Sequence, residues 1–203
     1  MNQYILSVIT LVVGYLLGSL SFSIIFTRLF ANTDVRDHGS GNAGFTNTMR
    51  TAGKKAAILV FLCDALKVAL AIMLAWALSD EVLPVYAAAF GGVLGHNFPL
   101  YYHFRGGKGI VVSITAIFMI NWQIGLVVLA GFLVAFLLFG YVSLGSITGA
   151  AVLPIATAFI ERGNWKLLAL FLLMSALAIF MHRGNIKRLL EGTESNVRRK
   201  KNG

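Results

Sequence analysis

Residues 56–78 read AAILVFLCDALKVALAIMLAWAL, an apolar run that only Asp64 and Lys67 interrupt with charge. A helix needs about 20 apolar residues to cross the hydrocarbon core of a bilayer, so this run predicts a transmembrane helix. Asp64 and Lys67 lie three residues apart and share one helix face. Opposite charges within a membrane usually face the interior of a helix bundle. We interpret the pair chiefly as an ion pair that orders the bundle, with a functional role as the alternative.

The rest of the chain has the same apolar character. It has 203 residues, of which 58% are hydrophobic and 12% charged, whereas soluble domains average about 25% charged residues. We therefore predict an all-α polytopic membrane protein with one domain, 1–203. Three of the apolar runs are short, so hydropathy alone allows either five or seven spans. The further runs are residues 4–30, 83–102, 110–120, 124–140, 147–160 and 167–181.

The N-terminus lacks the basic residues of a secretory signal, so we expect the first run to remain as a transmembrane helix. Charges between the runs predict the orientation, because basic loops stay in the cytoplasm. Basic residues follow the first, third and last runs, whereas Asp80 and Glu81 follow residues 56–78. This places the N-terminus outside and the C-terminus, with its basic tail 195–203, in the cytoplasm. Only an odd number of spans is consistent with both termini. In a seven-span model Arg162 and Lys166 lie outside, against this rule.

The net charge of +9 would suggest nucleic acid in a soluble protein. Here the basic residues lie in loops between apolar runs, where anionic lipid headgroups account for them, and no nucleic-acid partner is expected. The single cysteine, Cys63, lies within an apolar run and permits no disulfide within the chain. We interpret it as a small buried hydrophobic residue.

The first polar constellation is residues 38–50, HGSGNAGFTNTMR. Glycines allow the backbone N–H groups to approach a ligand closely, and an arginine fork suits phosphate oxygens. If the segment from Thr46 onward is helical, the loop also meets a helix N-terminus, which favours anions. The loop is therefore a predicted phosphate site rather than a flexible linker. Its candidate residues are Ser40, Gly41, Asn42, Gly44, Thr46, Asn47 and Arg50.

The second constellation is residues 95–109, GHNFPLYYHFRGGKG, in which Gly106, Gly107 and Gly109 surround Lys108. These residues again offer backbone amides and a cation at one point. The segment is not a Walker A loop, because Ile110 stands where Ser or Thr would bind magnesium. His96 is a further candidate, although a structural histidine is an equally good interpretation. His96 and His103 lie seven residues apart and have no carboxylate near them in sequence, so no metal site is expected.

The third constellation is residues 182–194, HRGNIKRLLEGTE. His182 stands where the last apolar run ends, and Asn185 lies one turn later if the helix continues. Arg183, Lys187 and Arg188 are interpreted as a basic patch at the lipid surface. In a model with an odd number of spans, all three constellations lie on the cytoplasmic side. They offer more than a single phosphate needs, and so they suit two phosphate-bearing substrates or one with a phosphate leaving group.

Two functional classes fit these residues. An enzyme is favoured over a transporter of phosphorylated metabolites, because transporters tend to show internal repeats and sites at the bilayer midplane. The chain has no evident repeat, and its polar clusters gather on one side. A lipid-binding scaffold would explain the basic tail but not the set Ser40, His182 and Asn185.

Three motifs, in this order, resemble the three cytoplasmic motifs of the bacterial PlsY family: residues 40–50, residues 95–99 with 104–109, and residues 182–188 with 192–194. The resemblance covers nearly the whole chain, including the Asp64 and Lys67 pair. It implies an acyl-phosphate-dependent glycerol-3-phosphate acyltransferase of the bacterial inner membrane. Its product would be lysophosphatidic acid, in the first committed step of phospholipid synthesis. It also implies seven transmembrane helices with the active site facing the cytoplasm, and so favours seven spans over five.

The resemblance further implies the substrates and the site. A long-chain acyl phosphate, supplied by a partner enzyme called PlsX, would donate its acyl chain to the sn-1 hydroxyl of glycerol 3-phosphate, without coenzyme A or another cofactor. The catalytic residues would be Ser40, His182 and Asn185, with Glu194 as a further candidate. The HxxxxD signature of other glycerolipid acyltransferases is absent after all four histidines.

The residues themselves limit the mechanism. His182 is the natural general base on pKa grounds, although a phosphate oxygen of the substrate is an alternative proton acceptor. Ser40 is expected to position substrate rather than to form an acyl-enzyme, because no GxSxG elbow surrounds it. Arg50, Lys108 and the glycine amides are expected to bind phosphate.

Overall fold

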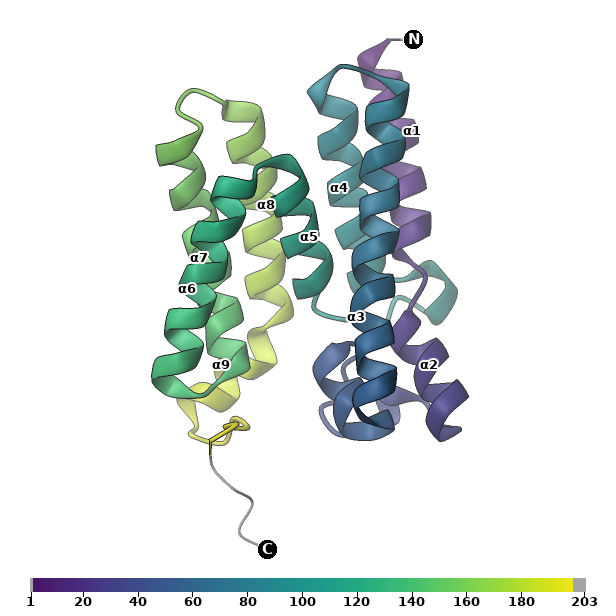
Figure 1. Cartoon of the computed structure of the whole chain (residues 1–203), viewed down its shortest axis with the longest axis vertical. Helices are drawn as coiled ribbons and strands as arrows, with labels where there is room; N and C mark the ends of the chain where they lie inside the picture. Colours follow the sequence, from purple (N-terminus) through teal and green to yellow (C-terminus); the bar gives the residue numbers. More distant parts are fainter. Residues whose placement is uncertain (1, 199–203) are drawn as a thin grey trace, which may run out of the picture. The chain divides into compact units, whose positions relative to one another are not determined.

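The structure, a computed structural model, describes residues 2–198. The end of the predicted basic tail, residues 199–203, lies outside the described part of the chain. The chain divides into two compact units, Met1–Met119 and Ile120–Gly203. All regular secondary structure within residues 2–198 is helical (Figure 1). The N-terminal unit contains α1 (Gln3–Gly18), α2 (Phe22–Ala31), η1 (Val35–Asp37), α3 (Phe45–Leu78), α4 (Val82–Asn97), η2 (Leu100–Tyr102) and α5 (Ile110–Ile120). The C-terminal unit contains α6 (Trp122–Phe139), α7 (Val142–Ile160), α8 (Trp165–Met181) and α9 (Arg183–Leu190).

Asparagine side chains begin three of these helices. Asn2 accepts a hydrogen bond from the Tyr4 amide at the start of α1, at 2.9 Å. Asn121 and Asn164 do the same at the starts of α6 and α8. Such caps satisfy one of the backbone N–H groups that lack a partner in the first turn. The amides of both Asn121 and Asn164 also donate to Glu161, which joins three helix ends of the C-terminal unit.

Helices α1 and α4 approach each other so closely that only glycine fits between them. A Cβ atom on Gly14 or Gly18 of α1 would collide with carbonyl oxygens of α4, and one on Gly91 or Gly95 of α4 would collide with carbonyl oxygens of α1. Each helix thus contributes two glycines four residues apart, the spacing of small-residue interfaces in membranes. Figure 1 shows α1, α3 and α4 side by side in this unit.

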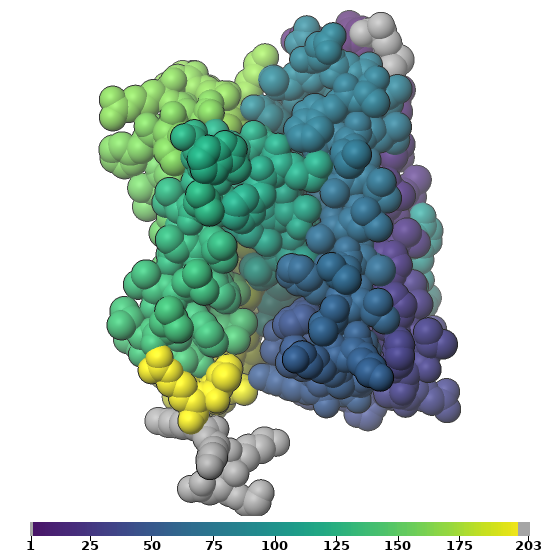
Figure 2. Space-filling view, in the orientation of Figure 1, coloured from purple at the N-terminus to yellow at the C-terminus, as the bar shows by residue number. Residues whose placement is uncertain are grey.

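The exposure of side chains along α3 is the reverse of that in a helix of a soluble protein. Its large apolar residues Leu62 and Leu66 are 55% and 56% exposed, whereas the ionisable Asp64 and Lys67 are 1% and 3% exposed. Figure 2 shows the α3 side chains, in blue, covering one face of the N-terminal unit. Without water to solvate charge, a bilayer favours this arrangement, with apolar side chains toward lipid and paired charges inside.

Within residues 2–198, four helical segments are long and apolar enough to cross a membrane, and a fifth is obtained if α8 and α9, bent by 55°, count as one span. The four are Gln3–Ala31, Phe45–Leu78, Trp122–Phe139 and Val142–Ile160. An all-helical protein with several candidate spans is thus confirmed, as predicted. Each of the seven apolar runs lies on a helix, but α4 has 16 residues and α5 has 11. The number seven and the orientation of the termini remain predictions.

Some helix boundaries differ from the apolar runs. The run 4–30 forms two helices, because residues 19–21 interrupt it. Within the run 83–102, Asn97 is the last residue of α4. The helix ends there because Pro99 disfavours the helical conformation of Phe98, the residue before it. Helix α3 begins at Phe45, well before the apolar run, and has a non-helical break at Gly53 with φ 84°. The helix expected from Thr46 onward is therefore present.

Candidate functional site

The first predicted constellation is held at its base by an ion-pair clamp. The Asp34 carboxylate lies 2.8 Å from the Arg36 guanidinium and 3.0 Å from that of Arg28. Its hydrogen bond with the Arg36 side chain is the main reason why the pKa of Asp34 is lowered to about 2. Arg36 Nη1 also donates to the carbonyl oxygen of Tyr102, at 3.0 Å. The clamp thereby connects the start of the first constellation to the second.

Asn47, in the first turn of α3, organises the loop around Ser40. Its Nδ2 donates to the carbonyl oxygens of Val35 and His38, both at 2.8 Å, and its Oδ1 accepts from the Ser40 amide at 3.1 Å. Asn47 is 1% exposed. Its amide is therefore engaged in shaping the loop, while Ser40 itself is exposed.

Glycines allow the sharp path of this loop. Gly39 and Gly41 have φ values of +59° and +68°, in the left-handed region that most residues avoid. A Cβ atom on Gly39 would also collide with Asn47 Oδ1. The loop ends at Gly44, which precedes the first turn of α3 and whose carbonyl accepts from the Asn47 and Thr48 amides. The exposed Thr46 lies at this helix N-terminus, where backbone N–H groups favour an anion.

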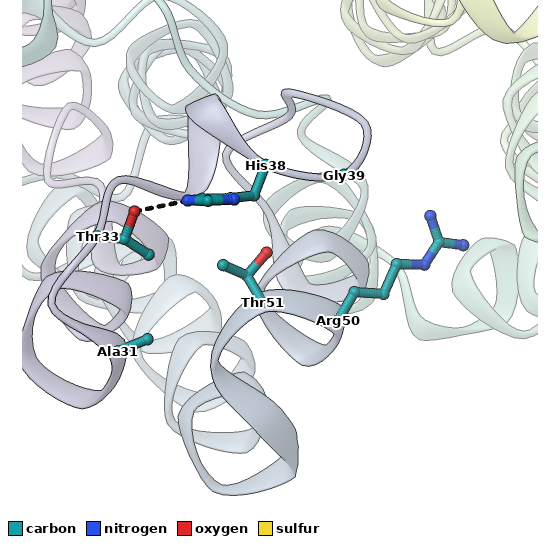
Figure 3. Close-up of a pocket in the computed structure, with 6 residues that line it drawn as sticks. All are labelled: Ala31, Thr33, His38, Gly39, Arg50 and Thr51. Carbon is teal, nitrogen blue, oxygen red and sulfur yellow. Dashed lines mark hydrogen bonds between the residues drawn. The ribbon is translucent and has the colours of Figure 1, made fainter.

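An open pocket of about 520 Å³ lies beside this loop. Figure 3 shows His38 bonded to Thr33 on one side, and Arg50 extending away from them on the other. The His38 Nε2 and Thr33 Oγ1 atoms are 2.7 Å apart. The pocket places Arg50, a predicted phosphate ligand, at the edge of a polar hollow. Its lining residues are Ala31, Thr33, His38, Gly39, Arg50 and Thr51.

Within the second constellation, the glycine-rich loop 106–109 packs against the C-terminal end of α4. The Gly107 amide donates to the His96 carbonyl oxygen at 3.1 Å. A Cβ atom on Gly106 would collide with this carbonyl, and one on Gly107 would collide with His96 Nε2 and the Ala43 carbonyl oxygen. Ala43 belongs to the first constellation, so the two glycine-rich loops touch within the N-terminal unit. The structure thus joins two segments that are about sixty residues apart in sequence.

The buried side chain of Asn97 lies against the backbone of the second glycine-rich loop. Its side chain is 1% exposed, and within residues 2–198 neither amide atom has a hydrogen-bond partner. A Cβ atom on Gly109, which has φ +78°, would collide with Asn97 Oδ1. The loop backbone therefore lies directly on this side chain. Gly109 also begins the turn that leads into α5, because its carbonyl oxygen accepts a hydrogen bond from the Ser113 amide at 2.8 Å.

The third constellation lies in the C-terminal unit, where His182 occupies the bend between α8 and α9. Its Nδ1 atom is 2.8 Å from the Ala178 carbonyl oxygen. A carbonyl oxygen only accepts hydrogen bonds, so Nδ1 carries the proton and Nε2 of the neutral ring carries the lone pair. His182 is 2% exposed. The fold thus fixes the tautomer that a general base requires.

Glu194 holds Asn185 in place. Its Oε1 accepts from Asn185 Nδ2 and from Ser143 Oγ, both at 2.7 Å, and its Oε2 accepts from Arg188 Nε at 2.7 Å. Burial acts to raise the pKa of Glu194, but these hydrogen bonds outweigh it and lower the pKa below its ordinary value. Glu194 therefore ties α9 to the first turn of α7 as a carboxylate.

The predicted residues thus fall into two groups. Ser40, Arg50 and both glycine loops belong to the N-terminal unit, and His182, Asn185 and Glu194 belong to the C-terminal unit. Sequence reasoning missed Ser143, the Asp34 clamp and the supporting role of Asn97. Only Asp34 carried a usable signal, since an aspartate directly before a short helical turn favours an N-cap. Ser143 and Asn97 gain their roles from contacts distant in sequence.

Comparison with known proteins gives a consistent result. A model of the family described as glycerol-3-phosphate acyltransferase matches residues 8–192. A glycerol-3-phosphate acyltransferase of Thermoanaerobacter sp. (strain X514) is 41% identical over 194 residues, which cover 96% of this chain and 97% of the relative. One of Clostridioides difficile (strain 630) is 42% identical over 199 residues, with the same coverage of both chains.

Solved structures extend the likeness to the fold. The glycerol 3-phosphate form of PlsY, an integral membrane glycerol 3-phosphate acyltransferase, matches with a TM-score of 0.85 and 33% identity. Its lysophosphatidic acid form matches with a TM-score of 0.83 and 32% identity. Each comparison covers 94% of both chains.

Proposed function

Since the chain belongs to the glycerol-3-phosphate acyltransferase family, we propose that it transfers a fatty acyl group from a long-chain acyl phosphate to the sn-1 hydroxyl of glycerol 3-phosphate. It is an integral membrane acyltransferase, and the products of the proposed reaction are lysophosphatidic acid and inorganic phosphate. Both units of the chain belong to one acyltransferase domain in this proposal. The enzyme would act at the cytoplasmic face of a bacterial inner membrane, with PlsX as the supplier of acyl phosphate.

One observation carries this proposal furthest. Gly107 packs against the Ala43 carbonyl oxygen, at a distance that only glycine allows, and so the two glycine-rich loops touch. Each loop has a cation beside its glycines, Arg50 in the first and Lys108 in the second. Backbone amides, an arginine fork and a lysine ammonium are the groups that hold phosphates. Two adjoining loops of this composition suit a reaction in which both substrates carry phosphate.

We assign phosphate binding to Arg50, to Lys108 and to the backbone amides of the two loops. The amides are those of Asn42, Thr46, Gly106 and Gly109. The amides of Gly41, Gly44 and Gly107 donate to the carbonyl oxygens of His38, Asn42 and His96, so these three glycines shape the loops instead. Asn47 has a different role in this proposal, because its amide is used within the loop: it positions Ser40. Ser40 in turn orients the glycerol 3-phosphate hydroxyl.

The chemistry needs alignment and charge stabilisation more than a covalent intermediate, because an acyl phosphate is already activated. The sn-1 oxygen attacks the acyl carbon, its proton passes to His182 Nε2, and the bond from the acyl carbon to the phosphate oxygen breaks. Asn185, which Glu194 holds, provides a neutral hydrogen-bond donor one helical turn after His182. No cofactor takes part in this scheme, since phosphate itself is the leaving group.

A donor comparison tests the proposal. The purified protein in detergent is supplied with glycerol 3-phosphate and either palmitoyl phosphate or palmitoyl-CoA, and lysophosphatidic acid is quantified. We expect lysophosphatidic acid when palmitoyl phosphate is the donor and none when palmitoyl-CoA is the donor. The opposite result would show that the assigned donor is wrong. Intact-mass spectrometry during turnover tests direct transfer, because a stable acyl adduct on Ser40 would contradict the positioning role of this residue.

A further inference from the structure

Three ionisable residues outside the proposed chemistry meet inside the N-terminal unit. Asp64 and Lys67 lie on α3, and His96 lies in the last turn of α4. Their exposed fractions are 1%, 3% and 7%. Burying three such groups costs free energy unless each one is paired. Their placement therefore calls for a physical account beyond the packing of two apolar helices.

Lys67 is the centre of this group. Its Nζ atom lies 2.7 Å from Asp64 Oδ1, 2.7 Å from the Leu20 carbonyl oxygen and 3.1 Å from His96 Nδ1. A lysine ammonium has three protons and no acceptor, so Lys67 donates to the Leu20 carbonyl oxygen and to His96 Nδ1 while it pairs electrostatically with Asp64. His96 Nδ1 is farther from Asp64 Oδ1, at 3.6 Å. His96 Nδ1 is consequently the acceptor. The neutral imidazole then carries its proton on Nε2, since the bond made by one ring nitrogen fixes the state of the other.

The protonated edge of His96 faces the glycine-rich loop. A Cβ atom on Gly107 would collide with His96 Nε2, so this nitrogen lies directly against the loop backbone. The His96 carbonyl oxygen accepts from the Gly107 amide at 3.1 Å. His96 thus supports Gly107 through both its backbone and its ring. Lys67 determines the ring's tautomer, and Asp64 holds Lys67.

We propose that Asp64, Lys67 and His96 form a buried chain of positioning residues that shapes the Gly106–Gly109 loop for a phosphate monoester. This inference rests on the proposed function, in which that loop binds the phosphate of glycerol 3-phosphate. Asp64 and Lys67 act through His96, and His96 acts by holding a donor edge under Gly107. Loss of this edge weakens phosphate binding and leaves the acyl-transfer step largely intact.

Two substitutions of His96 separate this role from general stability. In His96→Asn, the side-chain oxygen still accepts from Lys67, but no donor remains at the Nε2 position. In His96→Gln, the amide nitrogen reaches about the Nε2 position and replaces the donor. Both variants keep the Asp64–Lys67 ion pair, so neither leaves a buried charge without its counter-ion. Thr10→Val is the matched control, because it removes the α1–α4 hydrogen bond to the Pro84 carbonyl oxygen, made by a side chain at the other end of the interface.

Initial rates are measured with glycerol 3-phosphate varied and palmitoyl phosphate saturating. For His96→Asn we expect the KM for glycerol 3-phosphate to rise roughly tenfold, because the phosphate-binding loop loses its support, with kcat within about twofold. For His96→Gln we expect most of the affinity to return. The KM of Thr10→Val should equal that of the wild type.

Two results would overturn the inference: an unchanged KM in His96→Asn, or an equal rise in both His96 variants. Either one in an active wild-type background leaves the proposed function intact. If the wild type itself fails to acylate glycerol 3-phosphate, the proposed function is wrong. The thermal stabilisation of the same variants by glycerol 3-phosphate then decides the inference, because ligand binding raises the apparent Tm without catalysis.

A charge-free variant extends the test to α3. Asp64→Asn together with Lys67→Met removes both charges, which membrane and protein interiors tolerate better than the loss of one partner. It also removes the donor to His96 Nδ1, so the tautomer is no longer fixed. We expect a KM increase like that of His96→Asn in a protein that remains folded in detergent. A folded double variant with wild-type KM would show that the pair serves the bundle alone.

Discussion

At the scale of single residues, hydrogen bonds hold two side chains of the C-terminal unit in one orientation. His182 has its tautomer fixed by the Ala178 carbonyl oxygen, and Asn185 is held by Glu194. Glu194 is in turn shared with Ser143 and Arg188. Groups that are held in one orientation do not have to be ordered during a reaction, which is how positioned residues accelerate chemistry. This organisation supports the roles proposed for His182 and Asn185.

His182→Ala tests the proposed base. We expect kcat to fall by about 10²- to 10⁴-fold, the usual contribution of a positioned general base. His103→Asn is the control, because His103 is an exposed loop histidine with φ 56° and asparagine accepts this conformation. Initial rates of phosphate release provide the measurement. A folded His182→Ala enzyme with more than a tenth of wild-type kcat would instead favour a substrate phosphate oxygen as the proton acceptor.

The Asp34 clamp makes a prediction about pH. Because the pKa of Asp34 is lowered from 3.8 to about 2, the clamp contributes stability above pH 3.8 that disappears as the pH falls toward 2. Asp34→Asn keeps the N-cap but removes the charge. At pH 6 we expect this variant to lose about 1 kcal/mol of unfolding free energy, allowing for solvent near the pair.

This difference between wild type and Asp34→Asn should shrink as the pH is lowered from 4 to 2, in thermal unfolding followed by circular dichroism in detergent. Asp80→Asn serves as the control, since Asp80 is an exposed carboxylate at the other end of α3. A difference in Tm that stays constant over this range would show that the charge of Asp34 is not what stabilises the first loop.

At the scale of helices, hydropathy predicted where the apolar segments lie, because lipid exposure demands apolar side chains along α3 and α6. It did not predict the break between α1 and α2 or the end of α4 at Asn97, since backbone turns there depend on serines, proline and distant partners. Ser19, for example, accepts from the Leu100 amide at 3.2 Å, more than eighty residues away. The helix that follows the first glycine loop was predictable, because glycine commonly precedes a helix start.

The glycine interface of α1 and α4 also belongs to this scale. Gly91→Ala places a Cβ atom against the Leu11 carbonyl oxygen, so one helix must shift. We expect a loss of about 1–3 kcal/mol in the free energy of unfolding, as for other overpacked interiors. Gly149→Ala on α7 is the matched control, because its Cβ atom would lie 3.4 Å from Val128, an ordinary contact. Equal Tm values for the two variants would contradict the account of this interface.

At the scale of the whole molecule, the loops predicted from sequence to bind anions were identified by residue type, and the structure adds what supports them. Glycine, arginine and lysine could be identified from the sequence as candidate phosphate ligands, because phosphate binding requires backbone amides and cationic side chains. Their supports, Asn47 under Ser40 and His96 under Gly107, were ambiguous, since an amide or an imidazole serves a loop and a ligand equally well. Only the contacts to Val35, His38 and Lys67 separate these roles.

The orientation of the chain in the membrane is testable by cysteine labelling. In a variant with Cys63→Ser, single cysteines replace Asn2, Trp122 or Tyr141. With seven spans and an outside N-terminus, a membrane-impermeant maleimide added to spheroplasts should label positions 2 and 122. Position 141 should react only after permeabilisation. Labelling of 122 and 141 from the same side would contradict seven spans, and protection of position 2 would contradict the predicted orientation.

The central claim is direct acyl transfer from acyl phosphate, and stoichiometry tests it most directly. The purified wild-type protein is mixed with palmitoyl phosphate and glycerol 3-phosphate, without metal or coenzyme A, and phosphate and lipid product are quantified together. The account predicts equal amounts of inorganic phosphate and lysophosphatidic acid, with both lost when glycerol 3-phosphate is omitted. Phosphate release that continues without glycerol 3-phosphate, or folded protein that forms no lysophosphatidic acid, would contradict it.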